Sequence, residues 1–307
     1  MVKKGVGMGG RTRKLAVIEG ATAGVLFGTA AIFIKFLPNL NAFFIVFWRL
    51  IIACIALFVI TILLKKSFNL NLIRKNITQL FILSLFLALH FIFFVFALKD
   101  TTILNATVLV NTTPIFSVFI STFAFKLKPS VLAMVGLTLS FVGLCVIGYA
   151  ETVTFKNQFE GVSPSLKGDL EAVLAALLIA LYLNYGRKIR SQTSIFTLML
   201  PIYAFAAIAI GVLSIFITNA TFTMPFEIEV ILPLVGLGIL PTAIAHTLYF
   251  SSLSNLKSFE TATLALLEPV GATILGVALF QEIPAYQFVL GAVLVLLGIV
   301  FIVKEKG

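Results

Sequence analysis

The sequence contains very little charge for its length. Asp, Glu, Lys and Arg make up 11% of its 307 residues, whereas hydrophobic residues make up 60%. The mean hydropathy of +1.14 is far above that of a soluble domain, whose surface needs many more polar side chains. This scarcity of charge excludes an ordinary soluble protein and makes the lipid bilayer the expected solvent for most of the chain.

Cysteine and the motifs of membrane-embedded enzymes are also scarce or absent. Cys54 and Cys145 lie in separate apolar runs, so they form neither a disulfide framework nor a metal-ligand spacing. The sequence has no HExxH of a metalloprotease, no GxSG of a rhomboid-type protease, no aspartate-rich pair for a metal-bound diphosphate, and no P-loop. We therefore expect no cofactor, no metal and no enzymatic activity, with a membrane-embedded enzyme kept as an alternative.

Long apolar runs are what the sequence has instead. A helix needs about 20 apolar residues to cross the hydrocarbon core of a bilayer. By that measure we predict ten spans: 15–36, 41–64, 77–98, 102–125, 130–150, 168–187, 194–217, 229–252, 259–280 and 285–303. The connections are short apart from 151–167, so no soluble domain is expected.

The distribution of basic residues predicts the orientation of these spans. The net charge of +10 could suggest nucleic acid, but Lys and Arg occur in short clusters between apolar runs rather than in one patch. Of the 22 basic residues, 17 lie on the side of the N-terminus, four lie on the other side, and Arg49 lies inside the second span. Cytoplasmic loops carry an excess of positive charge. We therefore predict a cell-membrane protein with both termini cytoplasmic and no nucleic-acid partner.

The two halves of the chain are related by a repeat. Identical residues recur at a constant offset of 155 residues: Pro114 and Pro269, Pro129 and Pro284, Gly136 and Gly291, Gly143 and Gly298. Because each half holds five spans, an odd number, the second half must enter the membrane from the opposite side. The predicted fold is an all-α integral membrane protein whose ten transmembrane helices form two inverted five-helix repeats, 15–150 and 168–303, joined by the external linker 151–167.

Each half opens on a stripe of small residues spaced four apart. The residues are Gly20, Gly24 and Gly28 in the first span, and Gly168, Ala172 and Ala176 in the sixth. Small residues at this spacing let helices approach closely in lipid, where packing rather than the hydrophobic effect drives association. We expect both stripes to be helix-packing surfaces.

These motifs together resemble the EamA-type members of the drug/metabolite transporter superfamily. The openings read GATAGVLFG and GDLEAVLAA. The long fourth helix of each half carries a central proline, in NATVLVNTTPIFSVFISTFAFKLKP and ETATLALLEPVGATILGVALFQEIP, and the last helix of each half carries GLTLSFVG or GAVLVLLG. FWRLIIA and IFIKF also fit. One departure is Leu127, which stands where the repeat places Glu282.

The resemblance implies small-solute transport by alternating access, often the export of metabolites or amino acids. It also implies that the first four helices of each half surround a central cavity, with the fifth and tenth packed outside. On this basis we predict a secondary transporter of small organic metabolites, amino acids or similar, with export favoured. The predicted partners are a small-molecule substrate and the lipid bilayer, and a homodimer is compatible with the sequence. The alternative to transport, besides an enzyme, is a non-transporting membrane scaffold.

Ionisable residues inside spans are costly and usually functional. Glu268 lies near the middle of the ninth span, just before Pro269, and either supports the broken helix or binds substrate or a proton. His90 and His246 are one position away from repeat register and are open between pocket lining and packing. For Arg49 we favour anchoring one helix to another over binding an anion.

Other polar residues are assigned by their position in a span. Lys35 is expected to reach the membrane interface. The carboxylates near span ends are expected to be solvated: Glu19, Asp169 and Glu171. A polar patch before Pro114 is open between lining a cavity and bonding between helices: Asn105, Asn111, Thr112 and Thr113.

The candidate site combines the polar residues with aromatic residues of the same spans. Phe91 and Tyr185 are weaker aromatic candidates. The predicted substrate-binding residues are His90, Phe94, Asn111, Thr112, Tyr182, His246, Tyr249 and Glu268.

Overall fold

The computed structural model describes residues 11–66, 69–154, 165–218, 227–280 and 286–304. The regular structure in these ranges is entirely helical. The elements are α1 (Arg13–Phe27), α2 (Thr29–Lys35), α3 (Ala42–Leu63), α4 (Leu70–Lys75), α5 (Ile77–Asp100), α6 (Ile103–Val110), α7 (Thr113–Phe123), α8 (Val131–Thr154), α9 (Leu166–Arg190), α10 (Ile195–Thr218), α11 (Ile228–Leu237), η1 (Gly238–His246), α12 (Thr247–Ser252), α13 (Ser258–Leu264), η2 (Ala265–Leu267), α14 (Glu268–Phe280) and α15 (Tyr286–Val303).

Side chains at the first turns explain where several helices begin. The Thr12 hydroxyl accepts a hydrogen bond from the Leu15 amide at the start of α1, over 3.2 Å. Asn41 and Ser165 cap α3 and α9 in the same way. These caps satisfy amide groups that have no partner within the helix and that would be costly to leave unpaired near lipid.

The helices agree with the predicted spans in position. Eight segments of the described chain are long and apolar enough to cross a membrane. The sixth and ninth predicted spans, which correspond to α9 and to α13, η2 and α14, are not among these eight. Charged residues occupy both ends of α9, and a short 3-10 turn divides the ninth segment before Glu268. The fold is therefore that of a helical integral membrane protein, and the predicted linker 151–167 lies largely outside the described residues.

Three of the long segments are irregular near their centres. The fourth breaks between α6 and α7, where Asn111 ends one helix and Pro114 stands in the first turn of the next. The ninth changes to the 3-10 turn η2 just before Pro269. The eighth widens into the π-helix η1, which contains Pro241. Proline has no amide hydrogen, so each of these sites leaves helix carbonyl groups in need of another partner.

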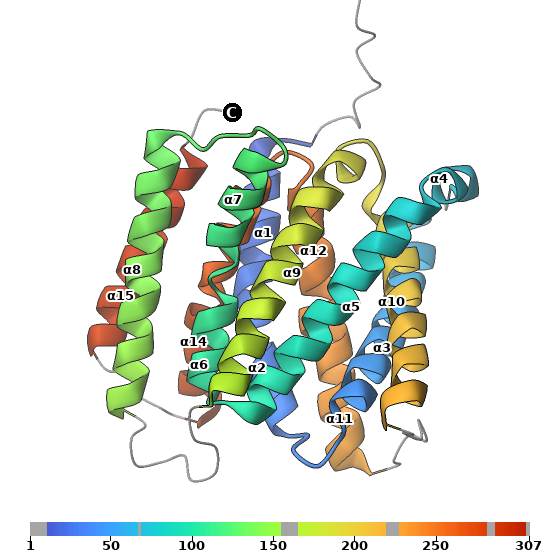
Figure 1. Ribbon diagram of the computed structural model, residues 1–307, viewed down its shortest axis with the longest axis horizontal. Helices are drawn as coiled ribbons and strands as arrows, with labels where there is room; N and C mark the ends of the chain where they lie inside the picture. The colour runs from blue at the N-terminus through green and yellow to red at the C-terminus, as the bar shows by residue number, and fades with distance from the viewer. Residues whose placement is uncertain (1–10, 67–68, 155–164, 219–226, 281–285, 305–307) are drawn as a thin grey trace, which may run out of the picture.

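The helices run between two ends of one bundle, and α1 begins at the end where α15 finishes (Figure 1). At one edge α8 and α15 lie side by side, and at the other α3 packs against α10 (Figure 1). Glycine permits the first contact: a Cβ on Gly143 would stand 2.6 Å from the carbonyl oxygen of Gly291, and one on Gly136 would stand 2.6 Å from that of Gly298. Helix α1 packs among α12, η1 and α14, whereas α9 packs among α5, α6 and α7.

The small-residue stripes lie in these contacts. A Cβ on Gly24 would clash with the carbonyl oxygen of Leu264 in α13, and one on Gly28 would clash with the backbone of α14 at Ala272. A Cβ on Gly168 would meet the backbone of Thr101 at 2.6 Å. The stripe of α1 therefore sets how closely α1 approaches α13 and α14.

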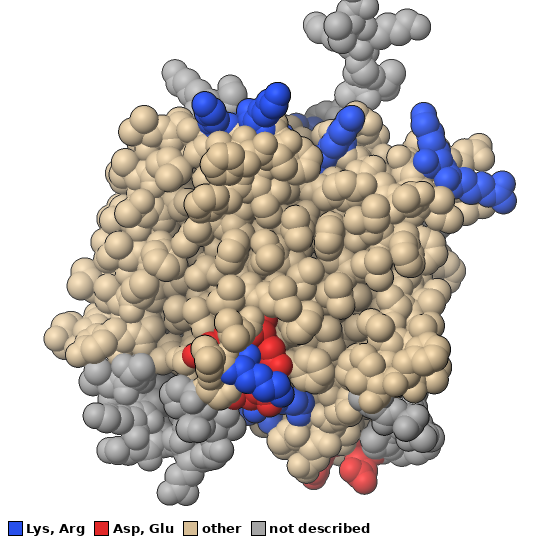
Figure 2. Space-filling view, viewed as in Figure 1, with Lys and Arg blue, Asp and Glu red and all other residues tan. Residues whose placement is uncertain are grey.

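The surface divides into two charged ends and an apolar middle (Figure 2). Lys and Arg gather at one end, which we call the basic end, and the opposite end carries Lys beside Asp and Glu (Figure 2). Large apolar side chains well inside the helices are widely exposed, including Ile208 at 61% and Ile55 at 59%. An apolar surface of this extent is stable only against lipid.

Candidate functional site

A pocket lies within the bundle, where the irregular parts of the fourth, eighth and ninth segments meet. The empty space inside it, its opening included, is about 510 Å³. Its lining consists of Phe27, Ala30, Arg49, His90, Phe91, Phe94, Val110, Asn111, Thr113, Ile179, Pro241, His246, Tyr249, Ala265 and Glu268. Among the described residues, α8, α10 and α15 contribute none of this lining. The residues that line the pocket therefore come from both halves of the sequence.

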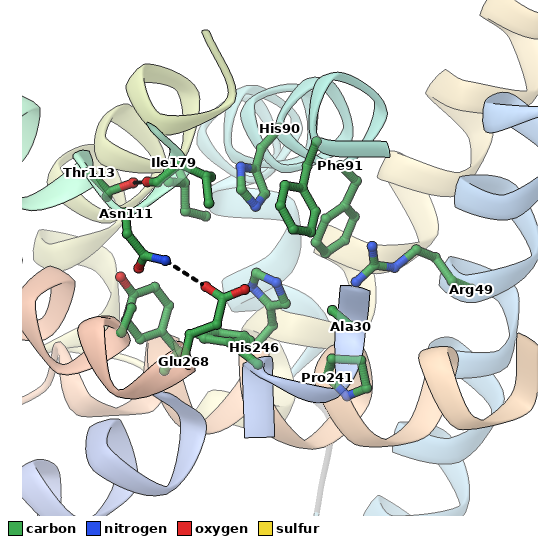
Figure 3. Close-up of a pocket in the computed structure, with 15 residues that line it drawn as sticks. Ala30, Arg49, His90, Phe91, Asn111, Thr113, Ile179, Pro241, His246 and Glu268 are labelled. Carbon is green, nitrogen blue, oxygen red and sulfur yellow. Dashed lines mark hydrogen bonds between the residues drawn. The ribbon is translucent and has the colours of Figure 1, made fainter. Parts of the chain in front are cut away.

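A hydrogen bond connects the two proline-broken segments across the pocket (Figure 3). Asn111 Nδ2 donates to Glu268 Oε2 over 3.1 Å and also to the carbonyl oxygen of Thr107 over 2.9 Å. Glu268 is 6% exposed and forms no ion pair within the described chain. The break after α6 thus supplies an amide donor to a carboxylate at the break before α14.

Two histidines stand between this bond and the aromatic side of the pocket. The His90 and His246 rings are 6.0 Å apart. His90 Nδ1 lies 2.9 Å from the carbonyl oxygen of Ala175, and since a carbonyl only accepts, this nitrogen carries the proton. His246 Nδ1 is buried without a hydrogen-bond partner in the described structure. The pocket therefore holds an imidazole nitrogen that is free to bond a solute.

Aromatic rings surround His246 closely. Its ring centroid is 4.7 Å from that of Phe27 and 4.7 Å from that of Phe91, and 6.4 Å from that of Tyr249. Phe94 stacks parallel to His90 at 6.2 Å. These rings make the site mostly apolar, with a small number of polar groups in fixed positions, as is typical of small-molecule pockets.

The structure brings together most of the predicted substrate-binding residues. His90, Phe94, Asn111, His246, Tyr249 and Glu268 line the pocket. Thr112 lies outside the lining, with its hydroxyl bonded to the Leu109 carbonyl oxygen over 2.6 Å. Tyr182 is fully buried against Phe250 with its hydroxyl 3.5 Å from the Met199 sulfur, so it packs between helices.

The polar patch before Pro114 has both of the roles left open by the sequence. Asn111 and Thr113 line the pocket. Asn105 instead donates to Asp169 Oδ1 of α9 over 3.1 Å, which joins two helices. Asp169 also accepts from the Thr101 hydroxyl over 2.8 Å, so it is not the freely solvated carboxylate that the sequence suggested.

Arg49 joins two segments, as the sequence favoured, since its Nε donates to Thr242 Oγ1 of η1 over 3.0 Å. It also lines the pocket. The π-helix around Pro241 was not predicted, and the only signal for it was a proline within the eighth apolar run. π-Helical turns occur frequently at functional sites.

A separate polar cluster holds the basic end together. Arg13 pairs with Glu260, at 2.7 Å between Nη2 and Oε1, and Arg11 pairs with Glu19. The Ser251 hydroxyl lies between Arg11 Nη2 at 2.7 Å and Arg190 Nη2 at 3.1 Å. We call these groups, which join the start of α1 to α9, α12 and α13, the basic-end cluster. Glu19 is thus paired, not solvated as expected.

The described geometry defines a class of protein: apolar helices that enclose a small, mostly apolar pocket with a few polar groups inside a bilayer, as in membrane transport proteins. The model of the EamA-like transporter family matches residues 14–149 and again 166–304. An uncharacterized transporter of Archaeoglobus fulgidus is 28% identical over 205 residues, 66% of this chain and 68% of the relative. The uncharacterized transporter YxxF of Bacillus subtilis is 23% identical over 298 residues, 97% and 92% of the two chains.

A solved crystal structure has the same fold. It aligns with a TM-score of 0.75 over 94% of this chain and 96% of that one, at 19% identity. The family model covers nearly the whole sequence, so the chain belongs to the EamA-like transporter family of the drug/metabolite transporter superfamily. It is a membrane transporter and not an enzyme.

Proposed function

We propose that this transporter exports small organic metabolites, amino acids or similar solutes, across the cell membrane by alternating access. The observation that carries the proposal is the hydrogen bond between Asn111 and Glu268 inside the pocket. It joins the irregular centres of two segments from opposite halves of the sequence. Broken helices near the membrane midplane expose backbone and side-chain polar groups to solutes in many transporters.

The alternating movement would follow from two inverted five-helix repeats, 15–150 and 168–303. The packing supports this division, because α1 lies among helices of the second half and α9 among helices of the first. The glycine contacts between α8 and α15 are reciprocal with respect to the repeat, because the first glycine of each helix meets the second glycine of the other: Gly136 meets Gly298 and Gly143 meets Gly291. In this arrangement one half rocks against the other around a shared site, with both termini in the cytoplasm.

The pocket composition supports a small, partly apolar solute. Its rings and aliphatic side chains can contact an apolar group, while Asn111, Glu268 and the histidines bond polar groups. Few charges lie in the lining, which suits amino acids and similar metabolites better than nucleotide-sugars. In this proposal His90, His246 and Glu268 contact the solute directly.

A metabolite comparison tests the proposal. Intracellular and extracellular pools would be measured in cells that express the wild type, His90→Ala, His246→Ala or Glu268→Gln, with Tyr182→Phe as a buried control outside the pocket. We expect at least one metabolite to accumulate outside with the wild type and with Tyr182→Phe. Each pocket variant should reduce that accumulation more than it reduces the amount of folded protein.

A wild type that changes no extracellular pool would contradict export. Native export by all three pocket variants would contradict the assignment of the site, whatever the solute.

A further inference from the structure

Arg49 carries a buried guanidinium whose Nη1 has no acceptor among the described residues. The side chain is 1% exposed, and its Nε donates to Thr242 Oγ1. Its Nη1 is buried without a partner, and no described carboxylate lies within ion-pair distance. The N–H groups of Nη1 are therefore unused, although arginine bonds well to carboxylates through paired parallel hydrogen bonds.

The surroundings of Arg49 do not compensate for its burial. Its guanidinium carbon lies 3.8 Å from the centre of the Phe91 ring. Such a cation–π contact stabilises a desolvated cation. Burying an unpaired ion costs more free energy than one such contact supplies. The ring therefore offsets only part of the cost, and an anionic partner would supply the rest.

Another buried arginine shows what protein-supplied partners look like. Arg190 is also buried, at 0% exposed, but its Nη1 donates to the Thr193 carbonyl oxygen over 2.8 Å and its Nη2 donates to Ser251 Oγ. Both terminal nitrogens of Arg190 are thus bonded within the protein. Its Nε has no partner among the described residues. Burial alone does not explain the unused Nη1 of Arg49, which lines the pocket whereas Arg190 does not.

The side chain of Arg49 is held in a fixed direction. Thr242 Oγ1, which accepts from Arg49 Nε, itself donates to the Leu237 carbonyl oxygen over 2.6 Å, and the Tyr203 hydroxyl donates to the Thr242 carbonyl oxygen over 2.8 Å. Figure 3 shows the guanidinium directed toward Phe91, on the side of the pocket away from the Asn111–Glu268 bond. The guanidinium of Arg49 is therefore oriented before any solute binds. The carboxylate of Glu268 lies on the opposite side of the pocket.

We propose that Arg49 binds the carboxylate of the transported solute and makes the pocket selective for solutes with an acid group. The inference rests on the proposed function, in which the solute is small and partly apolar. It adds that the solute must carry an acid group. A solute amide or amine of the same shape lacks the negative charge and leaves Arg49 unpaired. Amino acids and simple carboxylic acids both carry a carboxylate for Arg49. Only an amino acid also carries an amino group, which Glu268 on the far side of the pocket can bond.

The experiment uses full-length protein, purified in detergent and reconstituted into lipid vesicles. The probes are the common amino acids, their carboxamides, and the matching carboxylic acids without an amino group. Thermal stabilisation by each probe and counterflow of labelled probe are measured for the wild type, Arg49→Met, Arg49→Lys and the control Arg190→Met. We expect at least one acid to bind at least about tenfold more tightly than its amide, since a lost buried charge pair costs 1.4 kcal/mol or more.

Selectivity separates binding from a structural role. Arg49→Met should bind acid and amide alike, Arg49→Lys should restore part of the preference, and Arg190→Met should keep the full preference even where it lowers stability. Amino acids preferred over the deaminated acids would indicate an amino acid as solute, and equal binding would indicate a simple acid. If amides bind as well as acids, or Arg49→Met keeps the preference, the inference is wrong although transport stands. If no probe of any kind is bound or exchanged by the wild type, both the inference and the proposed function fail.

Discussion

The basic-end cluster and the central pocket both contain buried charges, but they treat them in opposite ways. In the cluster, Arg13 pairs with Glu260 and Arg11 pairs with Glu19. In the pocket, Arg49 and Glu268 form no ion pair within the described structure. Charges that neutralise one another within the protein hold helices together, whereas charges left unpaired at a pocket are available to a solute. In the proposed function, buried charge in this bundle therefore has two roles: it holds helices together in the cluster and binds the solute in the pocket.

Two matched substitutions test whether the pocket and the cluster have separate roles. These substitutions have the largest expected effects. Glu268 and Glu260 are similarly buried carboxylates, at 6% and 2% exposed. Glu268→Gln keeps an oxygen for Asn111 but removes the charge, so transport per folded molecule should fall at least about tenfold. Glu260→Gln loses the ion pair with Arg13 and should lower the free energy of unfolding by about 1–3 kcal/mol.

The measurement is counterflow in vesicles normalised to folded protein, together with thermal unfolding in detergent. Glu260→Gln should transport at nearly the native rate per folded molecule, and Glu268→Gln should unfold at nearly the native temperature. If both variants lost stability and transport in the same proportion, the two regions would not have separate roles.

The region between the cluster and the pocket gives the next largest effect. Helix α1 carries Arg13 at one end and Phe27 at the pocket, and Gly24 between them contacts the backbone of Leu264. Gly24→Ala should separate α1 from α13 and destabilise the protein by about 1–3 kcal/mol through overpacking. The matched control is Gly211→Ala, whose Cβ would lie 3.3 Å from the ring of Phe47, a side chain that can move.

Thermal unfolding and the yield of folded protein measure this difference. Gly211→Ala should remain within about 0.5 kcal/mol of the wild type, as surface-like substitutions usually do. Equal behaviour of the two alanine variants would mean that the stripe of α1 does not set the distance between α1 and α13.

The sequence predicted the parts of the site that depend on hydropathy and proline. Glu268 and His90 are conspicuous because ionisable residues are rare in apolar runs. Pro114 and Pro269 mark the two breaks because proline lacks an amide hydrogen. Position along a span therefore sufficed to place these residues near the centre of the bundle.

Residues whose role depends on a partner could not be predicted in the same way. Glu19 near a span end looks like an ordinary solvated carboxylate, and only the folded chain brings Arg11 and Ser251 beside it. The role of Arg49 in the pocket could not be predicted from the sequence either, because the lack of an acceptor for its Nη1 depends on which residues surround it in the folded chain. Tyr182 shows the opposite error, since it shares a helix with the pocket but packs on another face.

The smallest expected effect on stability is at the end opposite the basic end, where the charges are exposed instead of buried. Lys167, which precedes the predicted sixth span, pairs with Asp100 at 2.8 Å between Nζ and Oδ2, and its side chain is 73% exposed. The hydrogen bond and the negative charge of Asp100 raise the pKa of Lys167. A raised pKa means that the pair contributes stability below the unfolded pKa of lysine, about 10.4, and that this contribution is lost as the pH rises through the folded pKa.

Because water and salt screen an exposed pair, its contribution should be close to the limit of measurement. We expect Lys167→Met to change the unfolding temperature only slightly at neutral pH and low salt, and the difference should vanish in high salt and above the pKa of Lys167. Thermal unfolding of both proteins across pH and ionic strength measures this. A large decrease in unfolding temperature at neutral pH that salt does not change would contradict this expectation. It would show that an exposed ion pair holds helices as firmly as the basic-end cluster does. The difference between cluster and pocket would then depend on whether charges are paired, not on whether they are buried.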